Sequence, residues 1–469
     1  MAADSYISLV LHPDPLSERA PARILVLVDG EHYPPVVVDA IRGLPERFPG
    51  ATVVGAALLG GTEKIGSETP DYGVEVVTAD SADAALRAGI EAYGPDLVFD
   101  LSDEPVVDAR TRLRLIARAL AAGTAYAGGD FWFEPPPRPR LAEKPSLAVI
   151  GTGKRTGKTA VSAQMARVLR DRGTPPVVVA MGRGGPAEPE LVDPATFDLS
   201  AGGLVALAAS GRHAASDHLE DAVMSGVATV GTRRCGGGMA GAPAAANLRE
   251  GVALANGRTE SLLIFEGSGQ SIPPAHADAT VLVVPFTADP ELVTGHLGAY
   301  RVLLADLIVV TIGATSLAAS GLRASFEGDV GRLVQGVSAA PRIVRVILRP
   351  TPLAPISGRR VFYATTAPPA ARAHLAAHLE HQHGARVVGS SHNLANRRLL
   401  EAELAGAGNA EVLVVELKAA AIDVAARIAL ERGMDVVFCD NRVETISGDG
   451  SFDELAAEVA DLAARRFSA

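Results

Sequence analysis

The stretch 151-GTGKRTGKTA-160 places glycine, lysine and threonine residues at the spacing of a phosphate-binding loop. Such a loop needs inward-pointing backbone N–H groups, a helix N-terminus behind them, a lysine for the outer phosphates and a hydroxyl for Mg²⁺. Gly153 and Gly157 permit the turn, while Lys158 and Thr159 supply the cation and the hydroxyl. The chemistry expected of these residues is the binding of ATP with Mg²⁺ and the transfer of a phosphoryl group.

The loop departs from the usual pattern G-x-x-x-x-G-K-[ST], because Thr152 occupies the place of the first glycine. It also carries two additional cations, Lys154 and Arg155. A glycine-rich turn with a chance G-K-T is the alternative, but the surrounding strand and helix patterns favour a nucleotide loop. The residues expected to contact the nucleotide are Thr152, Gly153, Lys154, Thr156, Gly157, Lys158 and Thr159.

The loop is part of a chain in which short β-branched runs alternate with Ala/Leu/Arg helical patterns. This alternation is typical of βαβ units and parallel sheets. The predicted strands are 23–29, 51–59, 74–78, 97–102, 146–151, 177–182, 261–267, 280–285, 307–312, 342–348, 360–366, 386–391, 411–417 and 435–440. The clearest helical patterns are 106–123, 158–173 and 452–467. The fold class expected is α/β, with a mostly parallel P-loop NTPase-type sheet flanked by helices.

Proline positions divide this pattern into parts. The run 134-EPPPRPRLAEKP-145 lacks many backbone donors and favours an extended chain, so it indicates a linker. A second proline-containing join occupies 350–358. The predicted organisation is an N-terminal Rossmann-like α/β domain over 1–135, a linker over 136–145 and an ATP-binding P-loop domain over 146–350. Residues 359–469 form either a C-terminal α/β domain or an extension of the P-loop sheet, and the sequence leaves both open.

Composition excludes several classes of function. The net charge of −11 argues against a general binder of nucleic acid or anionic membranes, which would need a broad basic face. Apolar runs such as 307–314 are too short to cross a bilayer. Two distant cysteines, Cys235 and Cys439, make no disulfide framework, so a reducing cytoplasm is expected. Any anionic ligand must therefore be held by a local group of cations.

The loop with Thr152 in the glycine position resembles that of dethiobiotin synthetase and related deviant P-loop ATPases, which phosphorylate an oxygen anion. That resemblance implies a metal carboxylate at Glu266, in 265-FEGSG-269, and another at Asp217, in 216-SDHLEDAV-223. With Thr159 they would suffice for Mg²⁺, which needs few protein carboxylates. The alternative for the acids near Asp217 is a helix N-terminal turn that the macrodipole favours. A basic residue at Arg183 is also implied.

A more specific resemblance, to the cyclic 2,3-diphosphoglycerate synthetase family, covers essentially the whole length. The stretches that carry it are the K-R-T-G-K-T core, 28-VDGEHYPPVV-37, 181-MGRGGP-186, 216-SDHLEDA-222, 230-VGTRRCGGGMAGAP-243, 264-IFEGSGQSIPP-274, 392-HNLANRRLL-400 and 415-VELKAAAIDVA-425. The resemblance implies conversion of ATP and 2,3-diphosphoglycerate into a cyclic phosphoanhydride, ADP and phosphate. A phosphate nucleophile is already ionised, so positioning and charge neutralisation would carry the catalysis. Related deviant P-loop enzymes are commonly dimers, so the resemblance implies a homodimer.

The small polyanionic substrate would bring about five negative charges close to the triphosphate, and the repulsion requires cations. Arginine forks suit phosphate oxygens because they bind them bidentately. Substrate contacts are expected from Arg155, Arg183, Arg233 and Arg234, and catalytic roles from Lys154, Arg155, Lys158 and Arg183. For 233–234 the alternative is an exposed basic turn, although the glycines at 236–238 permit close backbone approach.

Two other functions share the same loop. A carboxylate-activating ligase of the dethiobiotin synthetase type would need an amine site and fewer cations around the acceptor. A partner-regulated switch ATPase usually carries a lysine where this chain has Gly153. Several further residues follow predicted strand ends, where they could line a cleft, and the sequence assigns none of them. They are His32, His392, Asn393 and Lys418.

Overall fold

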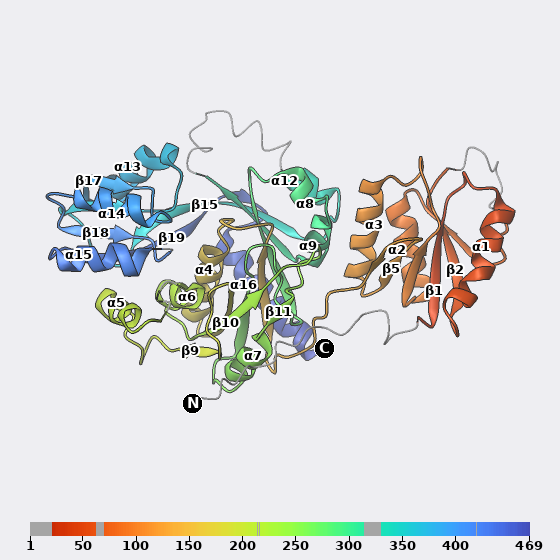
Figure 1. Cartoon of the computed structure of the whole chain (residues 1–469), viewed down its shortest axis with the longest axis horizontal. Coiled ribbons are helices and arrows are strands. Elements are labelled where there is room, and N and C mark those ends of the chain that lie inside the picture. Colours follow the sequence, from red (N-terminus) through yellow and green to blue (C-terminus); the bar gives the residue numbers. More distant parts are fainter. Residues whose placement is uncertain (1–20, 62–69, 213, 215, 314–329, 419) are drawn as a thin grey trace.

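The computed structural model describes the chain except for residues 1–20, 62–69, 213, 215, 314–329 and 419. Two sheets dominate it, one near the N-terminus and a larger one formed by the rest of the chain (Figure 1). Both are mostly parallel and flanked by helices, which confirms the predicted α/β class. No helix in the described ranges is both long enough and apolar enough to cross a membrane.

The N-terminal sheet has the strand order β3-β2-β1-β4-β5-β6. Its five parallel strands follow the order of a dinucleotide-type α/β fold, and β6 adds an antiparallel edge. Its central strand forms because the run ILVLV at 24–28 is apolar and buried on both faces. Asp108 caps α3, since its carboxylate accepts from the backbone N–H of Thr111 at 2.7 Å. The elements are β1 (Arg23–Val28), α1 (Pro34–Arg47), β2 (Thr52–Leu58), β3 (Val76–Thr78), α2 (Ala82–Tyr93), β4 (Leu97–Asp100), α3 (Ala109–Ala121), β5 (Ala125–Ala127) and β6 (Trp132–Phe133).

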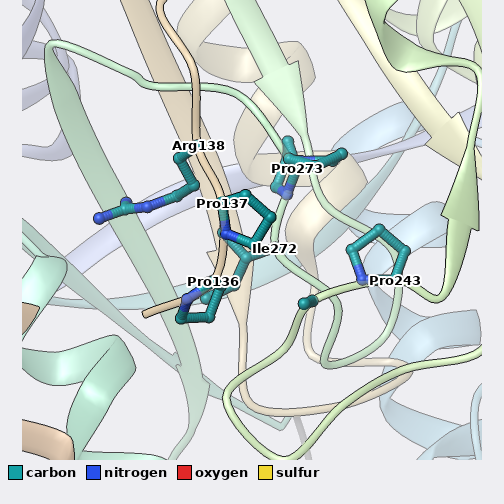
Figure 2. A pocket seen from close by; sticks show the side chains of 8 residues that line it. Pro136, Pro137, Arg138, Pro243, Ile272 and Pro273 are labelled. Carbon is teal, nitrogen blue, oxygen red and sulfur yellow. The ribbon is translucent and has the colours of Figure 1, made fainter. Parts of the chain in front are cut away.

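The segment predicted as a linker, 134–145, packs against the larger sheet. Pro139 accepts a hydrogen bond from the backbone of His276 at 2.9 Å, and Arg140 forms an ion pair with Asp278 at 3.3 Å. Figure 2 shows Pro136 and Pro137 beside Pro243, Ile272 and Pro273. The gap between them is apolar and of roughly water size, so it is a packing feature and not a substrate site.

The larger sheet places the phosphate-loop strand β7 between the parallel strands β12 and β13. Its order is β11-β10-β8-β12-β7-β13-β14-β15-β19-β18-β16-β17, with β9 paired to β10. The elements as far as β15 are β7 (Ser146–Gly151), α4 (Lys158–Asp171), β8 (Pro176–Gly182), β9 (Glu190–Val192), α5 (Ala201–Ala209), α6 (Asp217–Ser225), β10 (Thr229–Cys235), β11 (Ala245–Ala246), α7 (Leu248–Asn256), β12 (Leu262–Glu266), β13 (Ala279–Pro285), α8 (Pro290–Val293), α9 (Gly298–Leu304), β14 (Leu307–Ile312), α12 (Val330–Gln335) and β15 (Arg342–Pro352).

The remaining strands join this sheet through β15 and β19, which are antiparallel and pair from Val344 opposite Gly448 to Pro352 opposite Cys439. The elements are β16 (Arg360–Ala364), η3 (Pro369–Ala371), α13 (Arg372–His383), β17 (Arg386–Ser391), α14 (Arg397–Ala405), β18 (Val412–Val415), η4 (Ala421–Ala426), α15 (Arg427–Glu431), β19 (Asp435–Gly448) and α16 (Phe452–Ser468). The prediction for β19 ended at 440 and was too short. Its second half, 441–448, is polar and largely exposed, so the apolar signal stops before the strand does.

The last helix, α16, returns to the phosphate-loop part of the sheet. Ser451 and Glu454 form a capping box that begins it. Its apolar residues recur at helical spacing and pack on α4, β7 and β13. Those residues are Phe452, Leu455, Ala456, Val459, Ala460 and Ala463. The strand and helix that hold the phosphate loop are thus covered by the end of the chain (Figure 1).

Candidate active site

The phosphate loop lies between the buried strand β7 and helix α4, as predicted. Gly157 has a φ of 93°, a left-handed conformation that favours glycine, and it precedes the first residue of α4. A Cβ atom there would lie 3.0 Å from Cδ1 of Leu348 and 3.2 Å from Cγ2 of Thr311. Thr311 also donates to the carbonyl oxygen of Thr156 at 2.9 Å. Strands β14 and β15 therefore support the loop from the side.

Lys158 is buried and bridges the loop. Its Nζ donates to the carbonyl oxygen of Gly153 at 2.7 Å and to Oγ1 of Thr156 at 3.3 Å. Burial lowers the pKa of Lys158 to about 8, against the opposing effect of Glu266 and Asp217. The ammonium is therefore held inside the loop, where a phosphate would replace these neutral partners by a charged one.

Thr159 and Glu266 meet beside the lysine. The hydroxyl of Thr159 donates to Oε1 of Glu266 at 2.8 Å, and Glu266 is the last residue of β12. Its other oxygen, Oε2, is buried and has no hydrogen-bond partner among the described residues. Burial raises the pKa of Glu266 above its ordinary value. A hydroxyl and an unsatisfied carboxylate oxygen thus lie at the end of the strand next to the phosphate loop.

Helix α6 brings three acids to the same place. Asp217 is its first residue and is exposed, and its Oδ2 lies 3.1 Å from the point a Cβ of Gly182 would occupy. Glu220 and Asp221 are buried behind it. No donor of the described residues hydrogen-bonds to either carboxylate oxygen of Asp221, and its carboxyl group lies within hydrogen-bonding reach of Glu266. Burial, together with the neighbouring Glu266, raises the pKa of Asp221 well above its ordinary value, which favours the protonated form.

The hydroxyl and carboxylate oxygens described above are ligands of the kind that Mg²⁺ binds. Mg²⁺ is held by one or two carboxylates and keeps several waters, so a hydroxyl and orphaned carboxylate oxygens are an appropriate set. The orphaned atoms are Oε2 of Glu266 and both carboxylate oxygens of Asp221. Across the residues that the structure describes, no three His, Cys, Asp or Glu side chains are already arranged around a metal position. The donors fit Mg²⁺ in chemistry, with water expected to complete the shell.

Three of the predicted cations converge on the turn that follows Glu266. A Cβ atom added to Gly269 would lie 3.1 Å from Nη2 of Arg183 and 3.4 Å from Nη2 of Arg234. Cγ of Lys154 would lie 3.8 Å from the same point. The guanidinium groups of Arg183 and Arg234 and the side-chain stem of Lys154 thus approach one position. This is the arrangement needed to bring a second anion next to bound nucleotide.

The other two predicted cations are placed differently. Arg155 is exposed at the tip of the phosphate loop and has a φ of 58°, which is uncommon for a residue with a side chain. Arg233 precedes Arg234 on β10, so its side chain leaves from the opposite face of the strand. Of this adjacent pair, Arg234 is the one that the strand directs toward Gly269.

Comparison with known proteins agrees with this geometry. The family model described as "Cyclic 2,3-diphosphoglycerate synthetase, P-loop domain" matches residues 146–339. The N-terminal and C-terminal domain models of the same synthetase match 23–134 and 352–442. A cyclic 2,3-diphosphoglycerate synthetase of Rubrobacter xylanophilus is 47% identical over 434 residues, which cover 92% of this chain and 97% of that protein. The chain belongs to the cyclic 2,3-diphosphoglycerate synthetase family. This confirms the resemblance inferred from the sequence.

Archaeal members of the cyclic 2,3-diphosphoglycerate synthetase family are similar over comparable lengths. The protein of that name from Methanothermus fervidus is 40% identical, and the match covers 94% of this chain and 97% of the relative. The one from Thermococcus gammatolerans is 45% identical, with 90% and 94% covered. A crystal structure of a DUF1611 family protein from Anabaena variabilis matches with 13% identity over 80% of this chain and 95% of that one. Its TM-score is 0.18, so it supports no structural argument.

In this cyclic 2,3-diphosphoglycerate synthetase family member, Glu220 of α6 and Lys418 form an ion pair that sequence reasoning did not assign. Nζ of Lys418, which follows β18, lies 3.4 Å from Oε1 of Glu220. The pKa of Lys418 is raised above its ordinary value, first by Glu220. Asp221 follows Asp217 by four residues, and this spacing could have suggested a shared helix face. Lys418 gave no such signal, because its partner is distant in the sequence.

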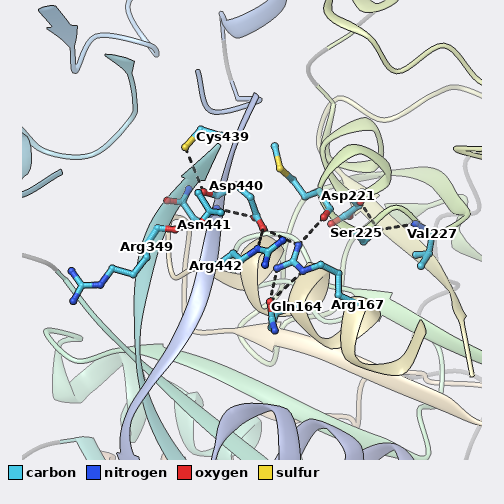
Figure 3. A network of polar contacts seen from close by, with 12 residues as sticks. Gln164, Arg167, Asp221, Ser225, Val227, Arg349, Cys439, Asp440, Asn441 and Arg442 are labelled. Atoms are coloured by element: carbon cyan, nitrogen blue, oxygen red, sulfur yellow. Dashed lines mark hydrogen bonds and ion pairs between the residues drawn. The ribbon is translucent and has the colours of Figure 1, made fainter. Parts of the chain in front are cut away.

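A buried ion pair fixes α4 to β19. Figure 3 shows Arg167 of α4 directed at Asp440, and the nitrogen Nη1 lies 2.8 Å from Oδ2. The same Nη1 donates to the carbonyl oxygen of Met224 at 2.7 Å, and Nη2 donates to Oε1 of Gln164 at 2.6 Å. Both partners of the pair are less than a tenth exposed. The helix that begins with Lys158 is thereby fastened to the strand that links the two halves of the sheet.

Proposed function

We propose that this chain catalyses the ATP-dependent synthesis of cyclic 2,3-diphosphoglycerate from 2,3-diphosphoglycerate. The observation that carries the proposal is the convergence of Lys154, Arg183 and Arg234 beside a phosphate loop. A ligase that activates a carboxylate would need fewer cations at this position, because its acceptor has less charge. Membership of the synthetase family supports the same acceptor.

The reaction has two displacements. An oxygen of one substrate phosphate attacks the γ-phosphorus of ATP, the bond to the β-phosphate oxygen breaks, and ADP leaves. The resulting pyrophosphate-type group is then attacked at its inner phosphorus by the neighbouring substrate phosphate. A phosphoanhydride closes the ring as inorganic phosphate departs. Neither step requires a protein base, since both nucleophiles are ionised, and catalysis rests on positioning and charge neutralisation.

The residues would divide this work as follows. Lys158 contacts the β- and γ-phosphates, and the loop backbone from Thr152 to Thr159 surrounds them. Lys154, Arg155 and Arg183 neutralise charge where the two anions meet. Of the adjacent arginines 233 and 234, the buried Arg234 is proposed to contact the acceptor, because Arg233 leaves from the opposite face of β10.

Thr159, Asp217 and Glu266 are proposed to hold Mg²⁺, with Asp221 added on the evidence of its orphaned oxygens. When bound, the ion would supply charge neutralisation at the terminal phosphates. Glu266 is already positioned for this by its hydrogen bond with Thr159. Burial raises the pKa of Glu220 to about 8, and the neighbouring Lys418 partly offsets that effect.

A homodimer in the cytoplasm is also proposed. The dimer rests on the resemblance to related P-loop enzymes alone. Cytoplasmic residence is supported by the thiols of Cys235 and Cys439, both of which are free. Sedimentation equilibrium would test the dimer, and a single species at the monomer mass would contradict it.

The test of the function is incubation with ATP, Mg²⁺ and 2,3-diphosphoglycerate, followed by phosphorus NMR. We expect phosphoanhydride signals of the cyclic product, with ADP and inorganic phosphate released in equal amounts. ATP consumption should be slow until 2,3-diphosphoglycerate is added. Absence of the cyclic product, with ATP consumption stimulated by a carboxylic acid instead, would overturn the proposal in favour of a ligase.

Replacing Arg155 with alanine should impair use of the acceptor and spare the nucleotide. Arg155 is exposed at the tip of the loop, so its removal leaves Lys158 and its contacts in place. We expect the KM for 2,3-diphosphoglycerate to rise about tenfold, as for the loss of a charge-assisted contact. Calorimetric affinity for ADP should change little. Arg249→Ala, at an exposed position on α7, is the matched charge control, and an equal loss of ADP affinity in Arg155→Ala would show that its role is misassigned.

A further inference from the structure

Arg301 is a buried cation whose charge has no anionic partner. It lies on α9 and is 3% exposed. Its Nε and Nη2 both donate to the carbonyl oxygen of Gln270, at 3.2 and 2.7 Å, and it forms no ion pair with a carboxylate among the described residues. Burial lowers the pKa of Arg301 to about 10. A buried charge is costly unless it is paired, so the position calls for an anion.

The surroundings of Arg301 connect it to the converging cations. Gln270 follows Gly269, the residue that Arg183 and Arg234 approach. On its other side Arg301 reaches the glycine-rich loop, because a Cβ added to Gly241 would lie 3.0 Å from its Nη2. The loop and the turn are joined there by a hydrogen bond of 2.8 Å from the N–H of Ile272 to the carbonyl oxygen of Gly241.

Arg234 occupies the opposite end of the same loop. Its Nη1 donates to the carbonyl oxygen of Gly236 at 2.6 Å, and its Nη2 donates to that of Ser268 at 2.7 Å. Its Nε is buried and lacks a partner in the described ranges. The side chain is 9% exposed, so this is an unsatisfied donor on a buried cation. A guanidinium group therefore lies at each end of the loop 236–241, and both groups donate only to uncharged oxygens in the hydrogen bonds that the described residues form.

The loop between these arginines has a backbone that a ligand can approach closely. Gly236 and Gly241 have φ values of 71° and 91°, which glycine adopts without strain. Gly237 and Gly238, between them, are exposed and leave the backbone uncovered by side chains. Glycine backbone beside cationic side chains is a usual form of anion-binding loop.

We propose that Arg234, Arg301 and the loop 236–241 form a subsite for the second phosphate of the acceptor, the one that does not attack ATP first. The identity of this anion rests on the proposed function. The phosphates of 2,3-diphosphoglycerate are on adjacent carbons, so the two must bind side by side. The first lies near Lys154 and Arg183, and the second lies past Gly269 and Gln270. Held there, the second phosphate is oriented for the ring-closing attack.

The test compares acceptors with one and two phosphates in calorimetric titrations. In the presence of Mg²⁺ and ADP, Arg301→Met should weaken binding of 2,3-diphosphoglycerate at least about tenfold, as for loss of a charge-assisted contact. Binding of 3-phosphoglycerate and of ADP should change by less than about twofold, since neither uses the subsite. Arg301→Lys keeps the charge and loses the fork, so it should give an intermediate loss for the diphosphate alone.

Arg138→Met is the matched control. Its guanidinium also packs near α9, 5.9 Å from the ring centroid of Tyr300, but it belongs to the linker and lines the apolar gap in Figure 2. It should leave binding of all these ligands unchanged. If Arg301 only supported the turn, Arg301→Met would weaken both acceptors and ADP together, and the subsite would be overturned. If Arg301→Met does not fold, the same binding measurements are made with Arg301→Lys and Arg234→Lys.

Measuring the binding of inorganic phosphate distinguishes failure of the proposed subsite from failure of the proposed function. Should the unmodified protein not bind 2,3-diphosphoglycerate while phosphate binding depends on Arg301, the function is wrong and the anion subsite stands. Should the cyclic product form with an unchanged KM in Arg301→Met, the function stands and the subsite is wrong. If neither anion binds, both are wrong.

Discussion

Replacing Lys158 with alanine should lower the rate of ATP turnover in the presence of 2,3-diphosphoglycerate by about a thousandfold. Lys158 is the buried cation inside the loop, and its ammonium contacts only uncharged oxygens there. Removal of one such preorganised donor from the site of transferring charge costs two to three orders of magnitude. The guanidinium groups of Arg183 and Arg234 are directed at Gly269 instead, so neither replaces the ammonium inside the loop. Single-turnover measurement with radiolabelled ATP gives the rate of the chemical step.

The control for this variant is Lys158→Met, which keeps the apolar stem and most of the volume. Both variants should lose turnover equally, while thermal unfolding of Lys158→Met should occur near that of the unmodified protein. A residual rate within tenfold of the unmodified protein would show that Lys158 is not the phosphate lysine. In that case Lys154, five residues from the end of the same loop motif, would be the next candidate.

Breaking the ion pair between α4 and β19 should have the largest effect on stability. Arg167 and Asp440 are 8% and 2% exposed, so Arg167→Met leaves the buried carboxylate with only its longer contact, of 3.8 Å, to Nε of Arg442. Such a loss costs about 3–5 kcal/mol of unfolding free energy. The double variant Arg167→Met with Asp440→Leu should recover most of that loss, because no charge then remains buried. Urea denaturation followed by circular dichroism measures both.

A surface pair on the same helix provides the comparison. Arg172, the residue that follows α4, lies 3.4 Å from Asp461 of α16, and both side chains are about half exposed. Arg172→Met should cost less than about 1 kcal/mol. Equal losses for Arg167→Met and Arg172→Met would contradict the importance of burial for the first pair.

The sequence predicted those parts of the site that are close together along the chain. The loop residues and their helix follow from one motif, and Glu266 and Asp217 come from short motifs of the family. Thr159 and Glu266 are indeed within hydrogen-bond distance, although their metal role stays a prediction. The α/β class could also be predicted, because apolar runs and helical patterns alternate along the chain.

Residues that meet only through the tertiary fold could not be predicted in this way. Arg301 has its nearest partners in the turn at Gln270 and the loop at Gly241, and nothing in its own segment distinguishes it from a surface arginine. Lys418 meets Glu220 because the sheet continues through β15 and β19, a pairing between strands that the sequence separates widely. The second half of β19 was missed for a local reason, since exposed strands lack an apolar pattern.

The position of α16 has a consequence for the order in which the protein acquires its structure. Strands β7 and β13 are made early, yet the helix that covers them follows the whole C-terminal part of the sheet in the sequence. During synthesis on the ribosome, the apolar face of these strands stays uncovered until Phe452 and the residues after it emerge. The nucleotide loop therefore reaches its final support only after nearly all of the chain has been translated. Ribosome-bound chains ending before α16 should bind chaperones in preference to ATP.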